Sequence, residues 1–255
     1  MTAIIPAAGK GTRFLPLTRA VPKEMLPIGA KPAIHCIVEE ALAAGADDIV
    51  LIISEEKEII RRYFDGDPEL SANIRYVYQR EQRGLGHAVL QAAGEVKGPV
   101  LILLGDALVS GPNPSVEMVA VSKANGGASV IGMERVPQEK VSRYGIAAVE
   151  GSVPTAGQSA RIVDLVEKPS PEEAPSDLAV AGRYFLDGAI FGLLETQQPG
   201  HGGEIQLTDS IRRLMEEKPV FAYVYPGKRQ DIGNPAGYFT ALEAFNGAPS
   251  KARQS

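Results

Sequence analysis

The clearest structural signal in this chain is its first stretch, Thr2-Ala3-Ile4-Ile5-Pro6-Ala7-Ala8-Gly9-Lys10-Gly11-Thr12-Arg13. Its apolar part predicts a buried parallel strand, after which Gly9 and Gly11 let the backbone turn tightly and bring N–H groups close to an anion. Lys10 and Arg13 add positive charge beside those amides. Another lysine, Lys23, follows in Pro22-Lys23-Glu24-Met25-Leu26-Pro27, between prolines that stiffen its backbone. These residues predict a cradle for a polyphosphate, and therefore a nucleotide enzyme.

The turn differs from two better-known phosphate-binding motifs. A dinucleotide fingerprint has a third glycine three positions after the second, where this chain has Phe14. A P-loop has Gly-Lys followed by Ser or Thr, with another glycine six residues before that lysine, and no stretch of the sequence provides it. A Gly-x-Gly turn alone often serves only tight packing, but Thr12, Arg13 and Lys23 favour phosphate binding here.

Composition excludes several classes of protein. The 255 residues fit one large α/β domain or two small ones. A hydrophobic content of 44% and a charged content of 22% are ordinary for a globular protein. The net charge of −5 argues against a nucleic-acid partner, which favours a basic surface stripe. Anionic substrates must therefore be bound by local lysines and arginines.

Neither a disulfide, a zinc site nor a membrane span is predicted. The single cysteine, Cys36, is expected to be a small buried residue, and it shows no zinc-ligand spacing with His35, His87 or His201. No apolar run approaches the ~18 residues of a membrane span, and the N-terminus lacks a signal-peptide layout. We therefore expect a cytoplasmic enzyme without a membrane partner.

Strand and helix patterns alternate through the first half of the chain. Strands are expected at residues 4–8, 49–53, 74–78 and 99–104, and helices at 33–44, 56–64 and 85–95. Such alternation predicts right-handed βαβ crossovers. The predicted fold class is α/β, with a Rossmann-like, mostly parallel central sheet and helices on both faces. Ligands bind beyond the carboxyl ends of such strands, where the opening turn falls.

The second half predicts a smaller mixed or antiparallel region that covers the ligand edge of the sheet. Strands are expected at residues 128–135, 145–149, 161–167, 178–186 and 220–225, and helices at 187–194, 205–216 and 235–246. We see no internal repeat and no low-complexity linker. A single domain over residues 1–246 is expected, with a flexible tail at 247–255.

Two aspartates follow predicted strands. Asp106 ends the apolar run Leu101-Ile102-Leu103-Leu104-Gly105, and Asp231 lies among glycines before the last helix. Either is compatible with a turn or helix cap. As a pair beside a phosphate cradle, they are more consistent with Mg²⁺, which binds one or two carboxylates together with substrate phosphates.

Further candidates lie along the same predicted edge. Gln79 can donate and accept hydrogen bonds to a pyrimidine, and the glycines of Gly84-Leu85-Gly86-His87-Ala88 allow a flat base to approach the backbone. For His87 a cap or packing role is favoured over catalysis. Glu167-Lys168 offers an acceptor for sugar hydroxyls beside a cation for phosphate, or an ordinary surface pair. The acids of the segment 204–209 suit a helix N-terminus.

The chain resembles the bacterial UTP–glucose-1-phosphate uridylyltransferases, within the sugar-phosphate nucleotidyltransferase superfamily. The resemblance runs in order from the first strand to about Ala244. It rests on the segments 7–13, 22–27 and 84–89 quoted above, and on Val166-Glu167-Lys168-Pro169, Gly182-Arg183-Tyr184, Glu204-Ile205-Gln206-Leu207-Thr208-Asp209 and Asp231-Ile232-Gly233-Asn234.

The resemblance implies a role for each matching residue. Uracil would be held by Ala8, Gly9, Glu24, Gln79 and Gly86, with Gly84 also on the nucleotide side, and the triphosphate by Gly11, Thr12, Arg13 and Lys23. Glucose would lie against Tyr144, Gly145, Glu167, Gly182 and Glu204, with Lys168 on its phosphate. Asp106 and Asp231 would bind Mg²⁺. Residues 1–110 would then form the nucleotide-binding part and residues 111–234 the sugar-phosphate part.

The implied reaction is UTP plus α-D-glucose 1-phosphate giving UDP-glucose and pyrophosphate, with Arg13, Lys23 and Lys168 as catalytic cations and no catalytic histidine. Transfer of thymidylyl, use of another hexose 1-phosphate, and a non-catalytic nucleotide-sugar sensor remain open. Two features depart from the family: Gly105 stands where a proline is usual, and the chain is shorter between residues 64 and 74 and at its end. A homo-oligomer is compatible with the resemblance, although the shortened regions make it the least secure implication.

Overall fold

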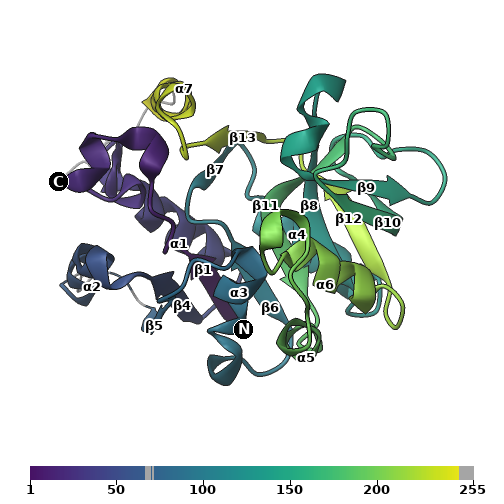
Figure 1. Cartoon of the computed structure of the whole chain (residues 1–255), viewed down its shortest axis with the longest axis horizontal. Helices are drawn as coiled ribbons and strands as arrows, with labels where there is room; N and C mark the ends of the chain where they lie inside the picture. The colour runs from purple at the N-terminus through teal and green to yellow at the C-terminus, as the bar shows by residue number, and fades with distance from the viewer. Residues whose placement is uncertain (67–69, 71, 247–255) are drawn as a thin grey trace.

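A computed structural model describes residues 1–66, 70 and 72–246 of the chain. Within them a nine-stranded mixed sheet has the order β5-β4-β1-β6-β11-β8-β12-β10-β9 (Figure 1). The strands are β1 (Thr2–Pro6), β4 (Asp48–Ile53), β5 (Asn73–Tyr78), β6 (Val100–Leu103), β8 (Ser129–Arg135), β9 (Gly145–Val149), β10 (Gln158–Glu167), β11 (Leu178–Leu186) and β12 (Val220–Val224). The flexible tail expected at residues 247–255 lies outside the described residues.

Helices cover both faces of the sheet. The helices are α1 (Ala33–Ala43), α2 (Glu58–Asp65), α3 (Leu85–Leu90), α4 (Pro114–Ala124), α5 (Ile190–Glu195), α6 (Leu207–Leu214) and α7 (Pro235–Asn246). Successive residues of a strand point to opposite faces, so Ile4 packs into the core beneath α3, α5 and α6, whereas Ile5 packs into the core beneath α1. Continuous apolar runs therefore form strands that are buried on both sides.

The central sheet is mixed rather than mostly parallel, because the mixed or antiparallel region predicted for the second half of the chain belongs to the same sheet. Strands β5, β4, β1 and β6 are mutually parallel, as predicted. Beside them β11 pairs antiparallel with β6, and among the remaining strands only β12 and β8 run parallel. The mixed region is thus a continuation of the same sheet. Alternation of patterns identifies strands, but it does not specify which strand pairs with which.

Several short elements were not predicted. They include α4, the strand pair β7 (Ala107–Ser110) and β13 (Lys228–Asp231), and the pair β2 (Pro27–Ile28) and β3 (Lys31–Pro32). The antiparallel pair β7–β13 brings Ala107 opposite Asp231 and lies beside the junction of the parallel and mixed halves (Figure 1). No helix among the described residues is long and apolar enough to cross a membrane.

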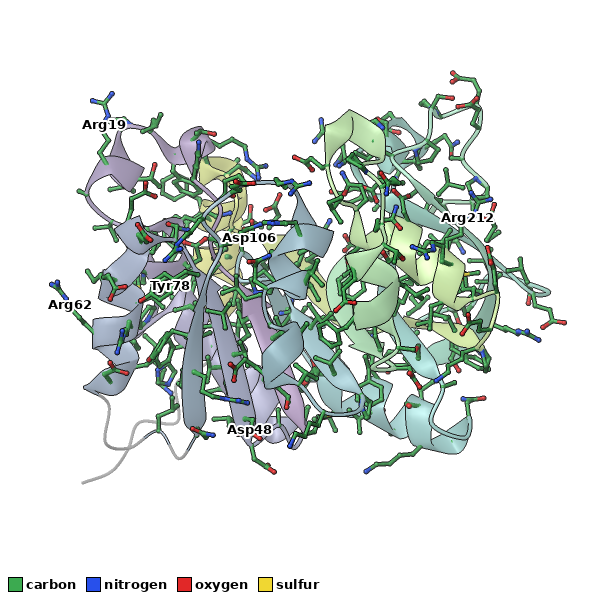
Figure 2. All side chains as sticks on the ribbon, turned by 60° about the horizontal axis from the view of Figure 1, so that its bottom comes forward. Arg19, Asp48, Arg62, Tyr78, Asp106 and Arg212 are labelled. Atoms are coloured by element: carbon green, nitrogen blue, oxygen red, sulfur yellow. The ribbon has the colours of Figure 1, made fainter. Side chains whose placement is uncertain are left out.

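The carboxyl ends of the parallel strands form one edge of the molecule. Figure 2 shows Asp106, which follows β6, at the opposite end of the sheet from Asp48, where β4 begins. Gly105 donates its N–H to the carbonyl oxygen of Pro6 at 3.1 Å, so the ends of β6 and β1 are tied together. A proline at position 105 has no N–H for this bond. The chain therefore leaves the sheet at Asp106 next to the glycine turn.

Candidate active site

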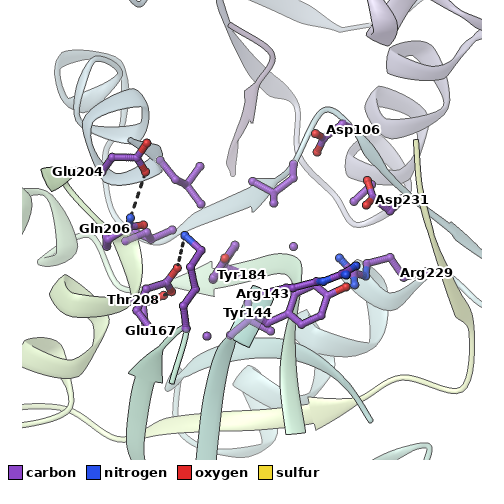
Figure 3. A pocket seen from close by; sticks show the side chains of 18 of the residues that line it. Asp106, Arg143, Tyr144, Glu167, Tyr184, Glu204, Gln206, Thr208, Arg229 and Asp231 are labelled. Atoms are coloured by element: carbon purple, nitrogen blue, oxygen red, sulfur yellow. Dashed lines mark hydrogen bonds and ion pairs between the residues drawn. The ribbon is translucent and has the colours of Figure 1, made fainter. Parts of the chain in front are cut away.

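Two adjoining cavities lie at this edge. The first, about 440 Å³, is lined by residues of the glycine turn, by Gln79 and by Gly84. The second, about 610 Å³, is lined by residues of β9, β10, β11 and β13 (Figure 3). Both cavities include Arg13, Leu85, Leu104, Asp106 and Glu204 in their walls. Ligands in the two cavities would therefore meet beside Asp106.

The two strand-end aspartates face the same small space. A methyl group built on Gly233 would lie 3.1 Å from Asp106 Oδ2, 2.8 Å from Asp231 Oδ1 and 3.0 Å from Arg13 Nη2. The backbone N–H of Ile232 also donates to the carbonyl oxygen of Asp106 at 2.9 Å. Figure 3 shows both carboxylates directed into the second cavity. Residues separated by more than a hundred positions in the sequence thus form one acidic cluster.

The Asp106 carboxylate is balanced by cations. Lys23 Nζ lies 2.5 Å from Asp106 Oδ2. Burial alone would raise the pKa of Asp106, but the Lys23 ammonium and then the Arg13 guanidinium outweigh it, so the pKa lies below its ordinary value. The carboxylate is therefore ionised at neutral pH and available to a cation.

The donor set suits a hard divalent cation. Asp106 and Asp231 supply carboxylate oxygens, the ligand type that Mg²⁺ prefers. Asp231 is held by the backbone N–H of Gly233 at 2.8 Å and by Asn234 Nδ2 at 3.1 Å. Among the described residues no group of three or more histidine, cysteine, aspartate or glutamate side chains is placed to hold a metal. A metal here would take its remaining ligands from substrate phosphates and water.

Gln79 presents its amide oxygen to the first cavity. Its Nε2 lies 3.3 Å from the carbonyl oxygen of Gly84 and 3.1 Å from His87 Nδ1. Because a backbone carbonyl only accepts, the nitrogen must face Gly84, which leaves Oε1 as the acceptor for a ligand. Burial, and then the charge of Arg83, lower the pKa of His87, so its ring is neutral. Gln79 Oε1 therefore suits a pyrimidine ring, whose N–H can donate a hydrogen bond to it.

Beneath the glycine turn lies a buried ion pair that sequence analysis missed in part. Lys57 Nζ donates to Glu24 Oε2 at 2.8 Å and to the carbonyl oxygen of Ala7 at 2.6 Å. Burial is the largest influence on both groups; it raises the pKa of Glu24 and lowers that of Lys57. Glu24, Ala8 and Gly9 line the first cavity. The Lys57 bond to Ala7 O fixes the backbone that carries them.

Gly84 brings the start of α3 against the 204–206 segment. Its φ is +104°, a conformation that only glycine adopts readily. A Cβ here would lie 2.7 Å from the carbonyl oxygen of Ile205 and 2.8 Å from Glu204 Cβ. The N–H of Gly86 donates to that same carbonyl at 2.8 Å. Two separate segments therefore meet at the wall between the cavities.

Replacing Gly84 by alanine is expected to lower the free energy of unfolding by about 1–3 kcal/mol, because the added Cβ strains the backbone and displaces Glu204. The KM of a substrate that binds in the first cavity should rise as well, since Gly84 lines this cavity. Chemical denaturation and steady-state kinetics measure the two effects. Gly94→Ala is the matched control: it is exposed, no atom lies within 4 Å of its added Cβ, and a change within about 0.5 kcal/mol is expected.

The second cavity combines an acid and a cation from one strand end. Glu167 Oε2 accepts from Thr208 Oγ1 at 2.6 Å, and Glu167 Oε1 lies 3.0 Å from Lys168 Nζ. Lys168 has a φ of +48°, the one positive value of a non-glycine residue among the described residues. Its N–H donates to the carbonyl oxygen of Tyr144 at 2.9 Å. Such strain is typical of functional sites and aims the ammonium into the cavity.

The structure brings most predicted site residues to these cavities. Those that line one or both are Ala8, Gly9, Arg13, Lys23, Glu24, Gln79, Gly84, Asp106, Tyr144, Gly145, Glu167, Lys168, Gly182, Glu204 and Asp231. Three others are placed differently. Gly11 lines a further cavity, of about 470 Å³, behind the glycine turn with Lys10, Arg19 and Lys57; Thr12 is exposed; and the N–H of Gly86 is already bonded to Ile205.

Other residues of the second cavity were missed. They include Arg143, Gln206, Thr208, Arg229 and Asn234. The Arg229 guanidinium stacks 4.7 Å from the centre of the Tyr144 ring, and its Nε donates to Glu134 Oε1 at 2.6 Å. Arg143 and Arg229 adjoin predicted residues in the sequence, but nothing in their local pattern distinguishes them from surface arginines. Their role depends on the pairing of strands far apart in the chain.

Comparison with known proteins gives consistent matches. The family model described as nucleotidyl transferase matches residues 2–246. A UTP–glucose-1-phosphate uridylyltransferase of Bacillus subtilis is 42% identical over 95% of this chain and 90% of its own length. One of Staphylococcus haemolyticus is 43% identical over 92% of this chain and 88% of its own length.

Solved structures agree with these sequence matches. A UDP-glucose pyrophosphorylase complexed with UDP-glucose superposes with a TM-score of 0.88 at 36% identity and covers 96% of this chain and 98% of its own. A UTP-bound UGPase from Acinetobacter baumannii has a TM-score of 0.82 at 34% identity, with 94% of this chain and 91% of its own covered.

Proposed function

The chain belongs to the nucleotidyl transferase family, among its UTP–glucose-1-phosphate uridylyltransferases, and on this premise we propose that it makes UDP-glucose and pyrophosphate from UTP and α-D-glucose 1-phosphate. It is an enzyme of nucleotide-sugar synthesis. The family generally uses a divalent metal. In this chain Asp106 and Asp231 would hold Mg²⁺ through their carboxylate oxygens.

The first cavity binds the nucleotide. Gln79 Oε1 accepts from N3–H of uracil, and Glu24, Ala8 and Gly9 form the wall beside the base. Thymine carries the same N–H, so this contact favours uracil over cytosine without excluding thymidine nucleotides. Arg13 and Lys23 neutralise the triphosphate at the point where the two cavities meet.

The second cavity binds glucose 1-phosphate. Glu167 and Glu204 accept hydrogen bonds from sugar hydroxyls, while Tyr144, Gly145 and Gly182 complete the wall. Lys168 orients the phosphate, which is already anionic at neutral pH and needs no general base. Arg143 and Arg229 add positive charge on the same side of the cavity.

The reaction is an in-line displacement at the α-phosphorus of UTP. An oxygen of the sugar phosphate forms the new P–O bond as the bond to the pyrophosphate breaks on the opposite side. Bound Mg²⁺ supplies charge neutralisation at the phosphates. Lys168 holds the nucleophile, and Arg13 and Lys23 stabilise the charge that develops on the leaving pyrophosphate. Positioning and electrostatic stabilisation carry most of the catalysis in transfers of this kind.

The observation that carries the proposal is the convergence of Asp106, Asp231 and Arg13 on one small space where a nucleotide cavity and a sugar cavity meet. A non-catalytic sensor would need no such arrangement of charges. The alternatives within the family differ only in the base or the sugar.

Pyrophosphate release over a panel of substrates tests the proposal. The purified protein with Mg²⁺ is expected to form UDP-glucose and pyrophosphate from UTP and glucose 1-phosphate. Its kcat/KM should fall when dTTP or CTP replaces UTP, and when galactose 1-phosphate replaces glucose 1-phosphate. A preference for dTTP or for another hexose 1-phosphate would change the assigned substrate but not the assigned type of reaction. Nucleotide-sugar binding without turnover for any pair would support a sensor.

A further inference from the structure

Arg183 on β11 is fully buried and has no place in the proposed reaction. Its Nε and Nη2 donate to Glu40 Oε1 and Oε2, each at 2.7 Å, in a bidentate pair. Nη2 also donates to the carbonyl oxygen of Ala107 at 2.6 Å, and Nη1 to the carbonyl oxygen of Gly182 at 3.1 Å. The guanidinium therefore joins helix α1 to one backbone carbonyl of β11 and one of β7.

Glu40 is fixed from its other side. It lies on α1, and its Oε1 also accepts from Ser115 Oγ at 2.6 Å. The carbonyl oxygen of Glu40 accepts from Asn113 Nδ2 at 3.0 Å, where α4 begins. Because α1 and α4 both pack on the same face of the sheet, the carboxylate is a rigid anchor for the arginine.

The two carbonyls belong to neighbouring segments that line the second cavity, since a Cβ built on Gly182 would lie 3.5 Å from Ala107 Cβ. Ala107 follows Asp106 directly, so the bond to its carbonyl sets where the aspartate leaves β6. Gly182 lines the second cavity at a register shift of β11, and its carbonyl also accepts from the N–H of Leu104 at 3.0 Å. One planar guanidinium thus ties the backbone that follows Asp106 to the backbone of Gly182, beside the direct bond between Leu104 and Gly182.

Stability does not account for this arrangement. Replacing a buried ion pair by apolar side chains of similar volume is often neutral or stabilising. Apolar side chains cannot, however, supply directional hydrogen bonds to two carbonyls. We propose that Arg183 and Glu40 form a positioning pair that holds Asp106 at a set distance from the Gly182 wall, an inference that rests on the proposed function.

The test separates positioning from stability. The double variant Glu40→Leu/Arg183→Met removes both charges of the pair together. The variant Arg183→Lys keeps the positive charge but lacks the planar guanidinium, whose nitrogens donate to two carbonyls. Wild type and variants are compared in three measurements: thermal unfolding, steady-state kinetics with UTP and glucose 1-phosphate, and Mn²⁺ affinity by electron paramagnetic resonance in the presence of UDP-glucose. Mn²⁺ serves as the probe for the metal site.

At least one variant is expected to fold with a Tm near that of wild type. In that variant kcat should fall by about 100-fold and Mn²⁺ affinity by about 10–100-fold. The KM for UTP should change little, because neither Arg183 nor Glu40 lines the first cavity. The matched control is Arg135→Met/Asp177→Leu, which removes an ion pair in which Nε and Nη2 of the exposed Arg135 both donate to Asp177 Oδ2, and it should leave all three measurements unchanged.

A folded variant with wild-type kcat and Mn²⁺ affinity would overturn the inference. So would loss of the folded state in both variants, since the pair would then serve folding rather than positioning. The wild-type assay keeps the proposed function separate: a wild type that makes no UDP-glucose refutes that function, whereas an active wild type matched by its variants refutes only the positioning pair.

Discussion

Asp106→Asn is expected to lower the turnover of UDP-glucose formation by more than about a hundredfold, the scale seen when a group that stabilises transition-state charge is lost. The amide keeps the size and one oxygen of the carboxylate but loses the negative charge. Asp106 lies where both cavities meet and faces Asp231 across the space beside Gly233. The variant should therefore also bind Mn²⁺ more weakly.

Steady-state pyrophosphate release and Mn²⁺ titration measure these effects, and circular dichroism checks the fold. Asp187→Asn is the matched control, because Asp187 also pairs with a lysine, Lys218, at 2.7 Å and has a pKa held below its ordinary value, but it lies in neither cavity. Normal turnover by a folded Asp106→Asn protein would contradict the assignment of the metal site.

Lys23→Met is expected to reduce kcat by a similar factor, more than about a hundredfold. Lys23 Nζ lies 2.5 Å from Asp106 and 4.0 Å from Glu24, so it links the metal-binding side to the wall of the base cavity. Its loss removes positive charge from the leaving pyrophosphate. It also leaves the Asp106 carboxylate without its closest cation, which should raise the pKa of Asp106 from its lowered value.

Measurement of kcat and of the KM for UTP distinguishes the catalytic effect from weakened binding. Lys218→Met breaks the comparable pair with Asp187 at 2.7 Å and should leave kcat unchanged. If Lys23→Met folds and releases pyrophosphate at nearly the normal rate, Lys23 does not act on the leaving group, and the charge must come from Arg13 or the metal alone.

Residues close together in the sequence were the most predictable part of the site. The glycine turn, Lys23 and Glu24 lie within a short segment, and the backbone requirements of that segment are visible in its glycines and prolines. Strands at 145–149 and 178–186 and the helix at 235–246 have the predicted bounds, because their apolar patterns end at clear turn residues. The family and the uridylyltransferase activity were also confirmed by the comparisons.

Residues that depend on strand pairing were the least predictable. Arg229 reaches the second cavity only because β13 pairs with β7, and neither short strand has a distinctive pattern. The polar segment around Lys57 predicts an exposed lysine, yet the side chain is buried against Ala7 and Glu24. Its burial depends on partners that approach only when β1 and β4 are side by side.

The sequence by itself determined the α/β class and the glycine turn after the first strand, and it singled out Asp106 and Asp231, because backbone conformation and hydrophobic burial are local properties of neighbouring residues. Only the tertiary structure decided that β11 joins the parallel strands in antiparallel orientation, that Asp106 and Asp231 converge, and that Arg183 donates to the carbonyls of Ala107 and Gly182. Those features are contacts between distant segments, and hydrogen bonds and charges act over a few ångströms only after the chain has folded.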